Sequence, residues 1–341
     1  MGSHRRLALS GLDRSTRVTV LSAAAATAAA AFAAPAGAAP QDTPATTKAK
    51  VDRLFEQAEK ATEAYNKADE RADTLREQVE QAKDSVARGQ ERINTMRGAL
   101  GSLAGAQYRS GGIDPSLALL LSSDPDGYLD KAAALDRINA RQAGELTDLQ
   151  KAQRSLAQER TEAGHKLSEL EKSRTAVARH KRSVEHKLAK ARQLLNSLSS
   201  QDREKYDRAS RSGRDEMPDL GSAGPSSSRA AAAIAAARSA IGKPYVWGAN
   251  GPSGFDCSGL TQWSYAQAGV GLPRTSQAQR YAGRQVPLAQ AQPGDLVAYR
   301  DDASHIGMYM GNGQVVHAPY PGAPVRYDPV GMMPVSSVTR I

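Results

Sequence analysis

The stretch Gly254-Phe255-Asp256-Cys257-Ser258-Gly259-Leu260 contains the chain's single cysteine and is the most informative part of the sequence for the fold. Small or apolar residues recur after it at helical spacing, at Leu260, Ser264 and Ala268. Asp256 is a natural N-cap, and Gly269 suits the end of such a helix. We therefore predict a helix over residues 257–268 with the thiol in its first turn.

That position favours chemistry at Cys257. The unpaired N–H groups and the positive end of the helix dipole favour a thiolate over a thiol, and the same N–H groups could hold an oxyanion. A lone cysteine cannot form an internal disulfide. The alternative is a small buried hydrophobic side chain, which is the commoner role of an isolated cysteine. A nucleophilic role requires a base nearby.

Two histidines follow in segments that are predicted to be strands. Residues 295–299, 305–310 and 314–317 have strand character, and Gly311-Asn312-Gly313 is typical of a hairpin turn. A three-residue loop would pair Met310 with Gln314 and place His317 opposite Gly307, diagonally beside His305. A two-residue loop would put the histidines on opposite faces, so a catalytic pair requires the longer loop or an equivalent bulge.

In this arrangement His305 is the general base and later the general acid, while His317 orients its ring. The alternative is a metal site, since one cysteine and two histidines could supply three of the four ligands of zinc. The sequence has no close pair of ligands such as Cys-x-x-Cys. We therefore expect no metal and no cofactor.

Several ordered blocks extend the pattern around these residues. They are Gly242-Lys243-Pro244-Tyr245-Val246-Trp247-Gly248, the cysteine block, Leu272-Pro273-Arg274-Thr275-Ser276, Pro293-Gly294-Asp295-Leu296-Val297 and the two histidine strands. In this order they resemble the NlpC family of papain-like cell-wall cysteine peptidases over residues 229–341. The resemblance implies an α+β fold in which the cysteine helix packs on an antiparallel sheet.

The resemblance also implies roles for individual residues. Cys257 is the nucleophile, His305 the base and His317 the third polar residue, while Tyr245, Asp256 and Ser258 border the substrate groove. The implied reaction is hydrolysis of peptidoglycan stem peptides between D-γ-glutamate and the following diamino acid. Two alternatives stay open: a wall-binding or scaffold module that does not cut, and an acyltransferase that uses the same Cys–His pair.

The N-terminus has the organisation of an export signal. Arginines precede an alanine-rich apolar run at residues 18–34, and Ala36-Gly37-Ala38 matches a cleavage site. We predict a cleaved signal peptide over residues 1–38. The mature protein is then expected to be secreted, extracellular or associated with the cell wall.

Residues 39–212 are predicted to form a coiled-coil helical hairpin. Small or apolar residues alternate at three- and four-residue spacing from position 51 to 103, and the spacing returns between 135 and 198. Pairs such as Glu56/Lys60 and Glu63/Lys67 are interpreted as a solvated helix surface. Residues 213–228 are rich in serine, glycine and proline and are predicted to be a flexible linker before the peptidase domain at 229–341.

The hairpin is expected to restrain the peptidase or to dock it on a membrane-bound division complex. The formal charge of +9 suits an anionic cell wall, and residues 229–341 contribute nine basic against five acidic side chains. These charges are scattered and match no nucleic-acid-binding motif, so no nucleic-acid partner is expected.

Overall fold

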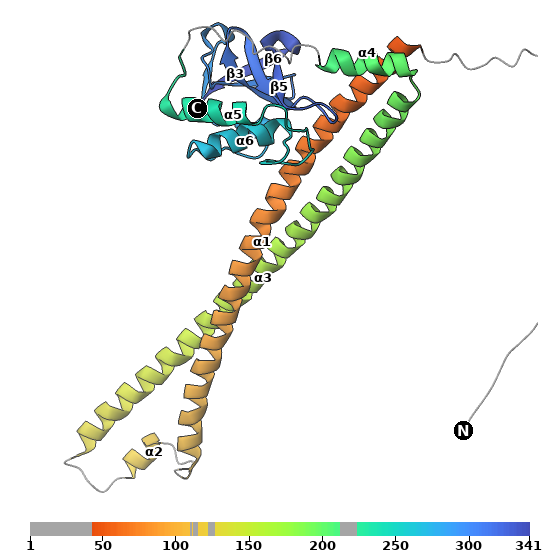
Figure 1. Ribbon diagram of the computed structural model, residues 1–341. Helices are drawn as coiled ribbons and strands as arrows, with labels where there is room; N and C mark the ends of the chain where they lie inside the picture. The colour runs from red at the N-terminus through yellow and green to blue at the C-terminus, as the bar shows by residue number, and fades with distance from the viewer. Residues whose placement is uncertain (1–42, 110, 112–114, 122–126, 212–223) are drawn as a thin grey trace, which may run out of the picture. The chain divides into compact units, whose positions relative to one another are not determined.

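The computed structural model describes residues 43–109, 111, 115–121, 127–211 and 224–341 (Figure 1). The predicted signal peptide and most of the predicted linker lie outside the described residues. Residues 43–341 pack as one compact unit. This unit holds two long helices, followed by a small domain in which helices pack on a sheet. The predicted α+β class, preceded by a helical hairpin, is confirmed.

The two long helices are α1 (Pro44–Arg109) and α3 (Tyr128–Asn196), which run antiparallel and are flanked by the short helices α2 (Pro115–Leu120) and α4 (Ser200–Arg211) (Figure 1). At about 1.5 Å per residue, α1 is about 100 Å long. The predicted apolar spacing marks the face of α1 that meets α3. Val51, Ala58, Ala72, Leu75 and Val79 are buried on this seam.

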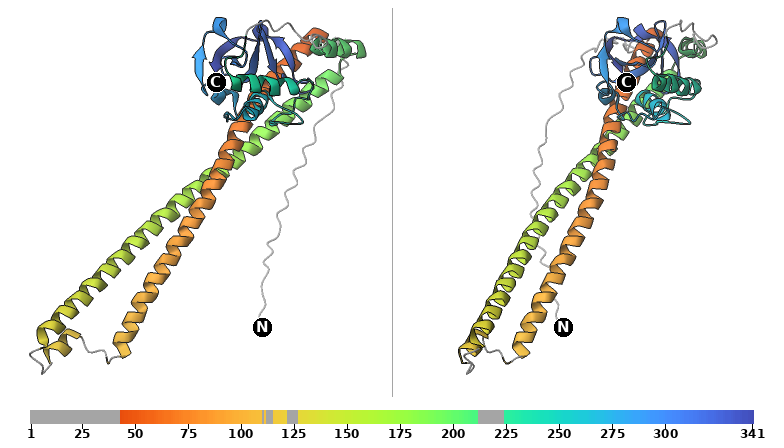
Figure 2. Two further views of the ribbon diagram at one scale, coloured as in Figure 1. Left: turned by 60° about the vertical axis from the view of Figure 1, so that its left-hand side comes forward. Right: turned by 90° about the vertical axis from the view of Figure 1, so that its left-hand side faces the viewer.

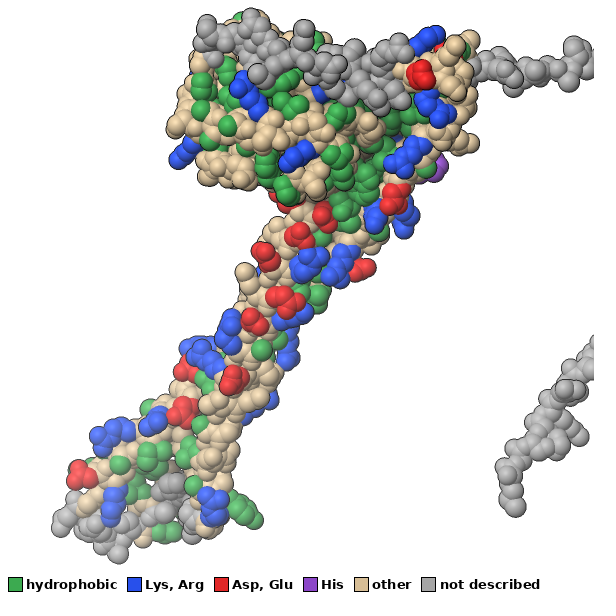
Figure 3. Space-filling model, in the orientation of Figure 1, with side chains coloured by type: hydrophobic (Ala, Val, Ile, Leu, Met, Phe, Trp, Pro, Cys, Tyr) green, Lys and Arg blue, Asp and Glu red, His purple; other side chains and the backbone are tan. Residues whose placement is uncertain are grey.

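Away from the seam, the hairpin surface is polar. Figure 3 shows basic and acidic side chains intermixed along its length, and several form exposed ion pairs, such as Lys83 with Glu80. Within the described part of the chain, no helix combines the length and apolar character needed to cross a membrane.

The C-terminal domain is built on a six-stranded antiparallel sheet in the order β1-β6-β2-β3-β4-β5. Figure 2 shows the sheet and its helices in two further views. The strands are β1 (Arg284–Val286), β2 (Leu296–Tyr299), β3 (His305–Gly311), β4 (Gln314–His317), β5 (Arg326–Pro329) and β6 (Val335–Arg340). Helices α5 (Ser228–Ser239) and α6 (Cys257–Gln267) share a buried apolar core with the sheet, and α7 (Ser276–Gln279) follows them. The three predicted strands around the histidines are present.

The register between β3 and β4 brings the two histidines to one face. The predicted pairing of Met310 with Gln314 is wrong, because Gly311 pairs with Gln314 across a two-residue turn. The register then shifts between Tyr309 and Gly311, so Met310 is an extra residue, as in a β-bulge. A Cβ at Gly307 would lie 3.2 Å from the Cβ of His317. The bulge therefore produces the facing that we expected from a longer loop.

Candidate active site

Cys257 is the first residue of α6, as the sequence predicts. Asp256 caps the helix by accepting a hydrogen bond from the N–H of Gly259 at 2.7 Å. The thiol is enclosed, because Cys257 is only 2% exposed. Burial raises the pKa of the Cys257 thiol well above its ordinary value, and the carboxylates of Glu63, Asp256 and Glu59 raise it further. The expectation that the helix N-terminus favours a thiolate is therefore overturned in this conformation.

The histidines form a hydrogen-bonded chain that ends on a carboxylate. His305 Nε2 lies 2.7 Å from His317 Nδ1, and His317 Nε2 lies 2.8 Å from Asp328 Oδ2. Asp328 also accepts a hydrogen bond from Arg326 Nε at 2.5 Å. Burial and the neighbouring His305 lower the pKa of His317 to about 4, although its hydrogen bond to Asp328 acts in the opposite direction. His317 is therefore neutral at pH 7.

The proton positions in this chain follow from its acceptors. His317 is neutral and faces a carboxylate through Nε2, so Nε2 carries its proton and Nδ1 accepts. His305 must then donate through Nε2. The other ring nitrogen of His305, Nδ1, lies 2.8 Å from Glu59 Oε1, which is a second carboxylate acceptor. His305 thus donates from both nitrogens and is an imidazolium.

Glu59 comes from α1 and is buried between two cations. Its second oxygen, Oε2, forms an ion pair with Arg300 Nη1 at 2.7 Å. Burial by itself would raise the pKa of Glu59, but the charges and hydrogen bonds of His305 and Arg300 outweigh this effect and hold the pKa below its ordinary value. The nitrogen of His305 that would receive the thiol proton is therefore occupied by a helix carboxylate.

Glu63, one turn further along α1, lies directly against Cys257. Its Oε1 accepts a hydrogen bond from Ser258 Oγ at 2.7 Å and lies 3.7 Å from Cys257 Sγ. Its Oε2 accepts from the N–H of Ser276 at 2.8 Å. Burial, reinforced by the charge of Asp256, raises the pKa of Glu63 to about 7. The interpretation of Glu63 as part of a solvated surface is wrong, because its side chain faces the peptidase domain.

The other residues expected at the groove also lie here. Asp256 accepts hydrogen bonds from Arg274 at 3.0 and 2.6 Å and from Asn66 of α1 at 3.1 Å. Ser258 accepts from Arg274 at 3.0 Å. Tyr245 is buried, and burial together with the charge of Cys257 raises its pKa well above the ordinary value. The structure thus brings together all six residues that the sequence analysis named.

Three positions at this site were not singled out from the sequence: Glu59, Arg300 and Asp328. Arg274 was noted only as part of an ordered block. The chain contains many glutamates and arginines at helical or loop positions, and nothing in their spacing separates these from solvated ones. One signal was available. Phe55 is a large aromatic residue directly beside the heptad position 54, and it stacks on Tyr320 with ring centroids 5.1 Å apart. An aromatic residue off the seam indicates a second contact surface on α1.

Two further contacts join α1 to the C-terminal domain near the two glutamates. Tyr65 of α1 meets Trp247 edge to face, with centroids 5.2 Å apart. Lys60 forms an ion pair with Asp302 at 3.1 Å. In the described residues, no group of three or more histidine, cysteine or acidic side chains is arranged to hold a metal ion. The site is thus a cysteine, a charged histidine and two inserted carboxylates.

Comparison with known proteins indicates the family of the C-terminal domain. Residues 242–338 match the model of the NlpC/P60 family. A probable endopeptidase of Corynebacterium glutamicum is 47% identical over 118 residues, which are 35% of this chain and 56% of that protein. A probable endopeptidase of Mycobacterium tuberculosis is 48% identical over 99 residues, which are 29% of this chain and 26% of that protein. The chain thus spans about half or less of the length of these relatives.

Among the solved structures to which the chain is similar is the P60 domain of an antigen from M. avium subspecies paratuberculosis. It is 38% identical, with a TM-score of 0.32, and the match covers 33% of this chain and 94% of that one. The family match lies within the domain that carries Cys257, His305 and His317. The C-terminal part of this chain therefore belongs to the NlpC/P60 family.

Proposed function

We propose that this protein is a secreted cysteine endopeptidase that hydrolyses peptidoglycan stem peptides, and that α1 holds it inactive. The family match and the relatives named as endopeptidases support a hydrolase. A solved relative, 36% identical to this chain, is described as a peptidoglycan hydrolase. The observation that carries the proposal is the placement of Cys257 in the first turn of α6, where its sulfur accepts a hydrogen bond from the N–H of Ile306, the residue next to His305 of the His305–His317–Asp328 chain.

The proposed reaction begins when α1 withdraws. His305 Nδ1 then accepts the thiol proton of Cys257, giving a thiolate beside an imidazolium. The thiolate attacks the carbonyl carbon of the bond after D-γ-glutamate, and the N–H groups at the start of α6 stabilise the oxyanion. His305 gives its proton to the leaving amine of the diamino acid. Water, deprotonated by His305, then releases the acyl group and restores the thiol.

Restraint by α1 is supported by the position of Glu59, whose carboxylate takes the place beside His305 that the Cys257 thiolate would occupy. In the active pair the imidazolium of His305 would face a thiolate, whereas here it faces the carboxylate of Glu59. Burial, together with the carboxylates of Glu63, Asp256 and Glu59, raises the pKa of the Cys257 thiol and keeps it neutral. His305 and Cys257 are also buried, so a peptide cannot reach them while α1 is docked. The block is both steric and electrostatic.

Release requires something that binds the hairpin better when α1 is withdrawn. We propose a membrane-bound division complex that contacts the long helices. The hairpin suits such a role, because its distant end carries the exposed apolar side chains Leu117, Leu120, Leu121 and Leu129. Restricting cleavage to sites where that partner is present would protect the rest of the wall.

The test is mass spectrometry of purified muropeptides incubated with the full chain and with an opened chain carrying Glu59→Ala and Glu63→Ala. We expect little cleavage by the former and cleavage after D-glutamate by the latter. Adding Cys257→Ala to the opened chain should abolish it. A matched control, Glu80→Ala with Lys83→Ala, removes an exposed ion pair from the same helix and should leave the full chain inactive. Intact muropeptides with the opened chain would contradict the proposal.

A further inference from the structure

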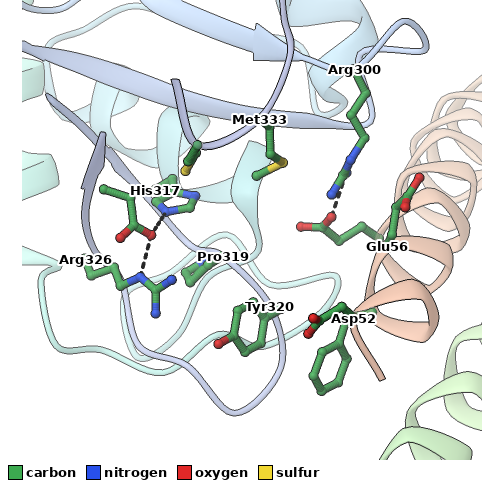
Figure 4. Close-up of a pocket in the computed structure, with 12 residues that line it drawn as sticks. Asp52, Glu56, Arg300, His317, Pro319, Tyr320, Arg326 and Met333 are labelled. Atoms are coloured by element: carbon green, nitrogen blue, oxygen red, sulfur yellow. Dashed lines mark hydrogen bonds and ion pairs between the residues drawn. The ribbon is translucent and has the colours of Figure 1, made fainter. Parts of the chain in front are cut away.

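A cavity of about 340 Å³ lies beside the catalytic histidines, between α1 and the sheet domain (Figure 4). Its two walls differ in charge. The α1 wall supplies the acidic residues Asp52, Glu56 and Glu59, whereas the domain wall supplies Arg300 and Arg326 with a single carboxylate, Asp328. The domain wall also has an apolar part formed by Pro319, Tyr320, Met332 and Met333. Withdrawal of α1 would therefore leave a groove that is cationic and partly apolar.

The two arginines of the domain wall differ in their partners. Arg326 is bound to Asp328, which belongs to the same domain and stays in place when α1 leaves. Arg300 forms its ion pair with Glu59, which belongs to α1 and leaves with it. The Arg300 side chain is only 19% exposed in the docked state. Its guanidinium thus lies in a recess of the C-terminal domain, where it binds the carboxylate of Glu59 from α1.

The backbone also fixes Arg300 at this position. Arg300 has a φ of 65°, in the left-handed region that residues with a side chain rarely adopt. Its N–H donates to the carbonyl of Pro334 at 2.8 Å, and its Nη1 lies 3.2 Å from Ser304 Oγ. Unfavourable backbone conformations that persist are concentrated at functional sites. The strained turn aims the guanidinium toward α1, as the Arg300 stick in Figure 4 shows.

The carboxylate of Glu59, which bridges His305 and Arg300, shows how close Arg300 lies to the reacting nitrogen of His305. One oxygen of Glu59 lies 2.8 Å from His305 Nδ1 and the other lies 2.7 Å from Arg300 Nη1. His305 Nδ1 is the atom that protonates the leaving amine in the proposed reaction. Arg300 therefore lies on the leaving-group side, one carboxylate away from the departing nitrogen.

We propose that Arg300 determines specificity by binding a free carboxylate on the residue that supplies the leaving amine. This inference rests on the proposed function and names its substrate class: a diamino acid whose side chain ends in both an amine and a carboxylate. The methylene groups of that side chain would lie along Pro319 and Met333. Lysine, or a diamino acid with an amidated side chain, lacks the anion that Arg300 binds. Glu59 occupies the place of this substrate carboxylate in the docked state.

The experiment uses the full-length opened chain, Glu59→Ala with Glu63→Ala, with and without Arg300→Gln. The substrates are three L-Ala-γ-D-Glu-X-D-Ala peptides with the terminal carboxyl amidated. X is meso-diaminopimelate, its side-chain amide, or lysine. We expect the opened chain to favour diaminopimelate by at least about tenfold in kcat/KM. Arg300→Gln should remove that preference by raising KM while changing kcat little. Arg300→Lys should restore part of it.

A second measurement separates this role from a structural one. In the chain with both glutamates present, Arg300→Gln removes a partner of Glu59, so α1 should dock less tightly and alkylation of Cys257 should become faster. The same substitution thus activates the closed chain and weakens the opened one. Equal kcat/KM for all three peptides in the opened chain, or equal losses on all three with Arg300→Gln, would overturn the assignment while leaving the endopeptidase intact. Cleavage of none of the peptides would overturn the proposed function itself.

Discussion

Helix α1 contacts α3 on one side and the C-terminal domain on another. Each contact is made by a stripe of buried residues at helical spacing, but one stripe is apolar and the other is mostly polar. The stripe facing α3 is apolar and includes Val51, Ala58, Ala72 and Leu75. The stripe facing the peptidase domain is buried at positions 55, 59, 62, 63 and 66, where one phenylalanine is followed by four polar residues. Apolar burial makes a contact that persists, whereas buried carboxylates that depend on partner cations make a contact that can be released. The first stripe maintains the hairpin, and we propose that the second restrains Cys257.

The largest effect should come from a charge on the apolar stripe. Leu75 is buried with Val79 and Leu170, so Leu75→Asp would place an unpaired carboxylate in the seam and destabilise the hairpin by about 3 kcal/mol or more. Thermal melting followed by circular dichroism should show the loss. The exposed Gln81→Asp on the same helix is the matched control. Equal melting of both variants would mean that the seam contributes little.

A smaller effect is expected from the aromatic residue of the second stripe. Phe55→Ala removes the stacking on Tyr320 and opens space at the docking surface, which should weaken docking by about 2–3 kcal/mol. Cys257 alkylation should become faster, with helix content unchanged. Tyr108→Ala, which removes an exposed aromatic side chain from the same helix, should have no such effect. Unchanged alkylation with Phe55→Ala would show that the carboxylates alone hold α1 in place.

The smallest effect concerns pH. Docking raises the pKa of Glu63 from 4.5 to about 7, mainly through burial and the charge of Asp256. A group with a raised pKa in the docked state stabilises docking fully below pH 4.5, and this contribution is lost as the pH rises through about 7. Docking should therefore weaken by several-fold or more across that interval. Cys257 and Arg274 also face Glu63 and carry groups that can titrate. The effect of Glu63 is therefore isolated by comparing two chains that differ only at position 63.

Glu63→Gln provides that internal comparison, because it cannot titrate while the other charges stay in place. The rate of tryptic cleavage within α1 reports docking without depending on the ionisation of the thiol. The original chain should become more sensitive from pH 5.5 to 7.5, corrected for the pH dependence of trypsin on an unfolded substrate. The variant should lack most of this step. An identical step in both chains would assign the pH dependence to another group.

The catalytic elements were predictable because their signals are local. The Asp256 cap, the Cys257 helix and the histidine strands each depend on a few consecutive residues. The Met310 bulge was foreseen only as one of two ways to satisfy the chemistry, since Gly311-Asn312-Gly313 is compatible with more than one turn. A strong local pattern thus fixed the strands but not their register.

The second stripe could not be predicted for a physical reason. In the sequence, a buried glutamate cannot be told from a solvated one, because both can occur at the same helical spacing. Only the cationic side chains that contact it in the folded protein distinguish the two. The partners of Glu59, His305 and Arg300, lie more than 200 residues further along the chain. Asp328 was missed for a related reason, because it acts through His317 across a strand pairing that no local motif marks.

Alkylation of Cys257 with iodoacetamide at pH 7 is the sharpest test of whether Glu59 and Glu63 keep Cys257 a buried, neutral thiol. The full chain is compared with Glu59→Gln and with the control Glu80→Gln, which removes a charge from an exposed ion pair with Lys83 on the same helix. We expect alkylation at least about tenfold faster for Glu59→Gln and unchanged for Glu80→Gln. Equal rates in all three chains would contradict this role of the glutamates.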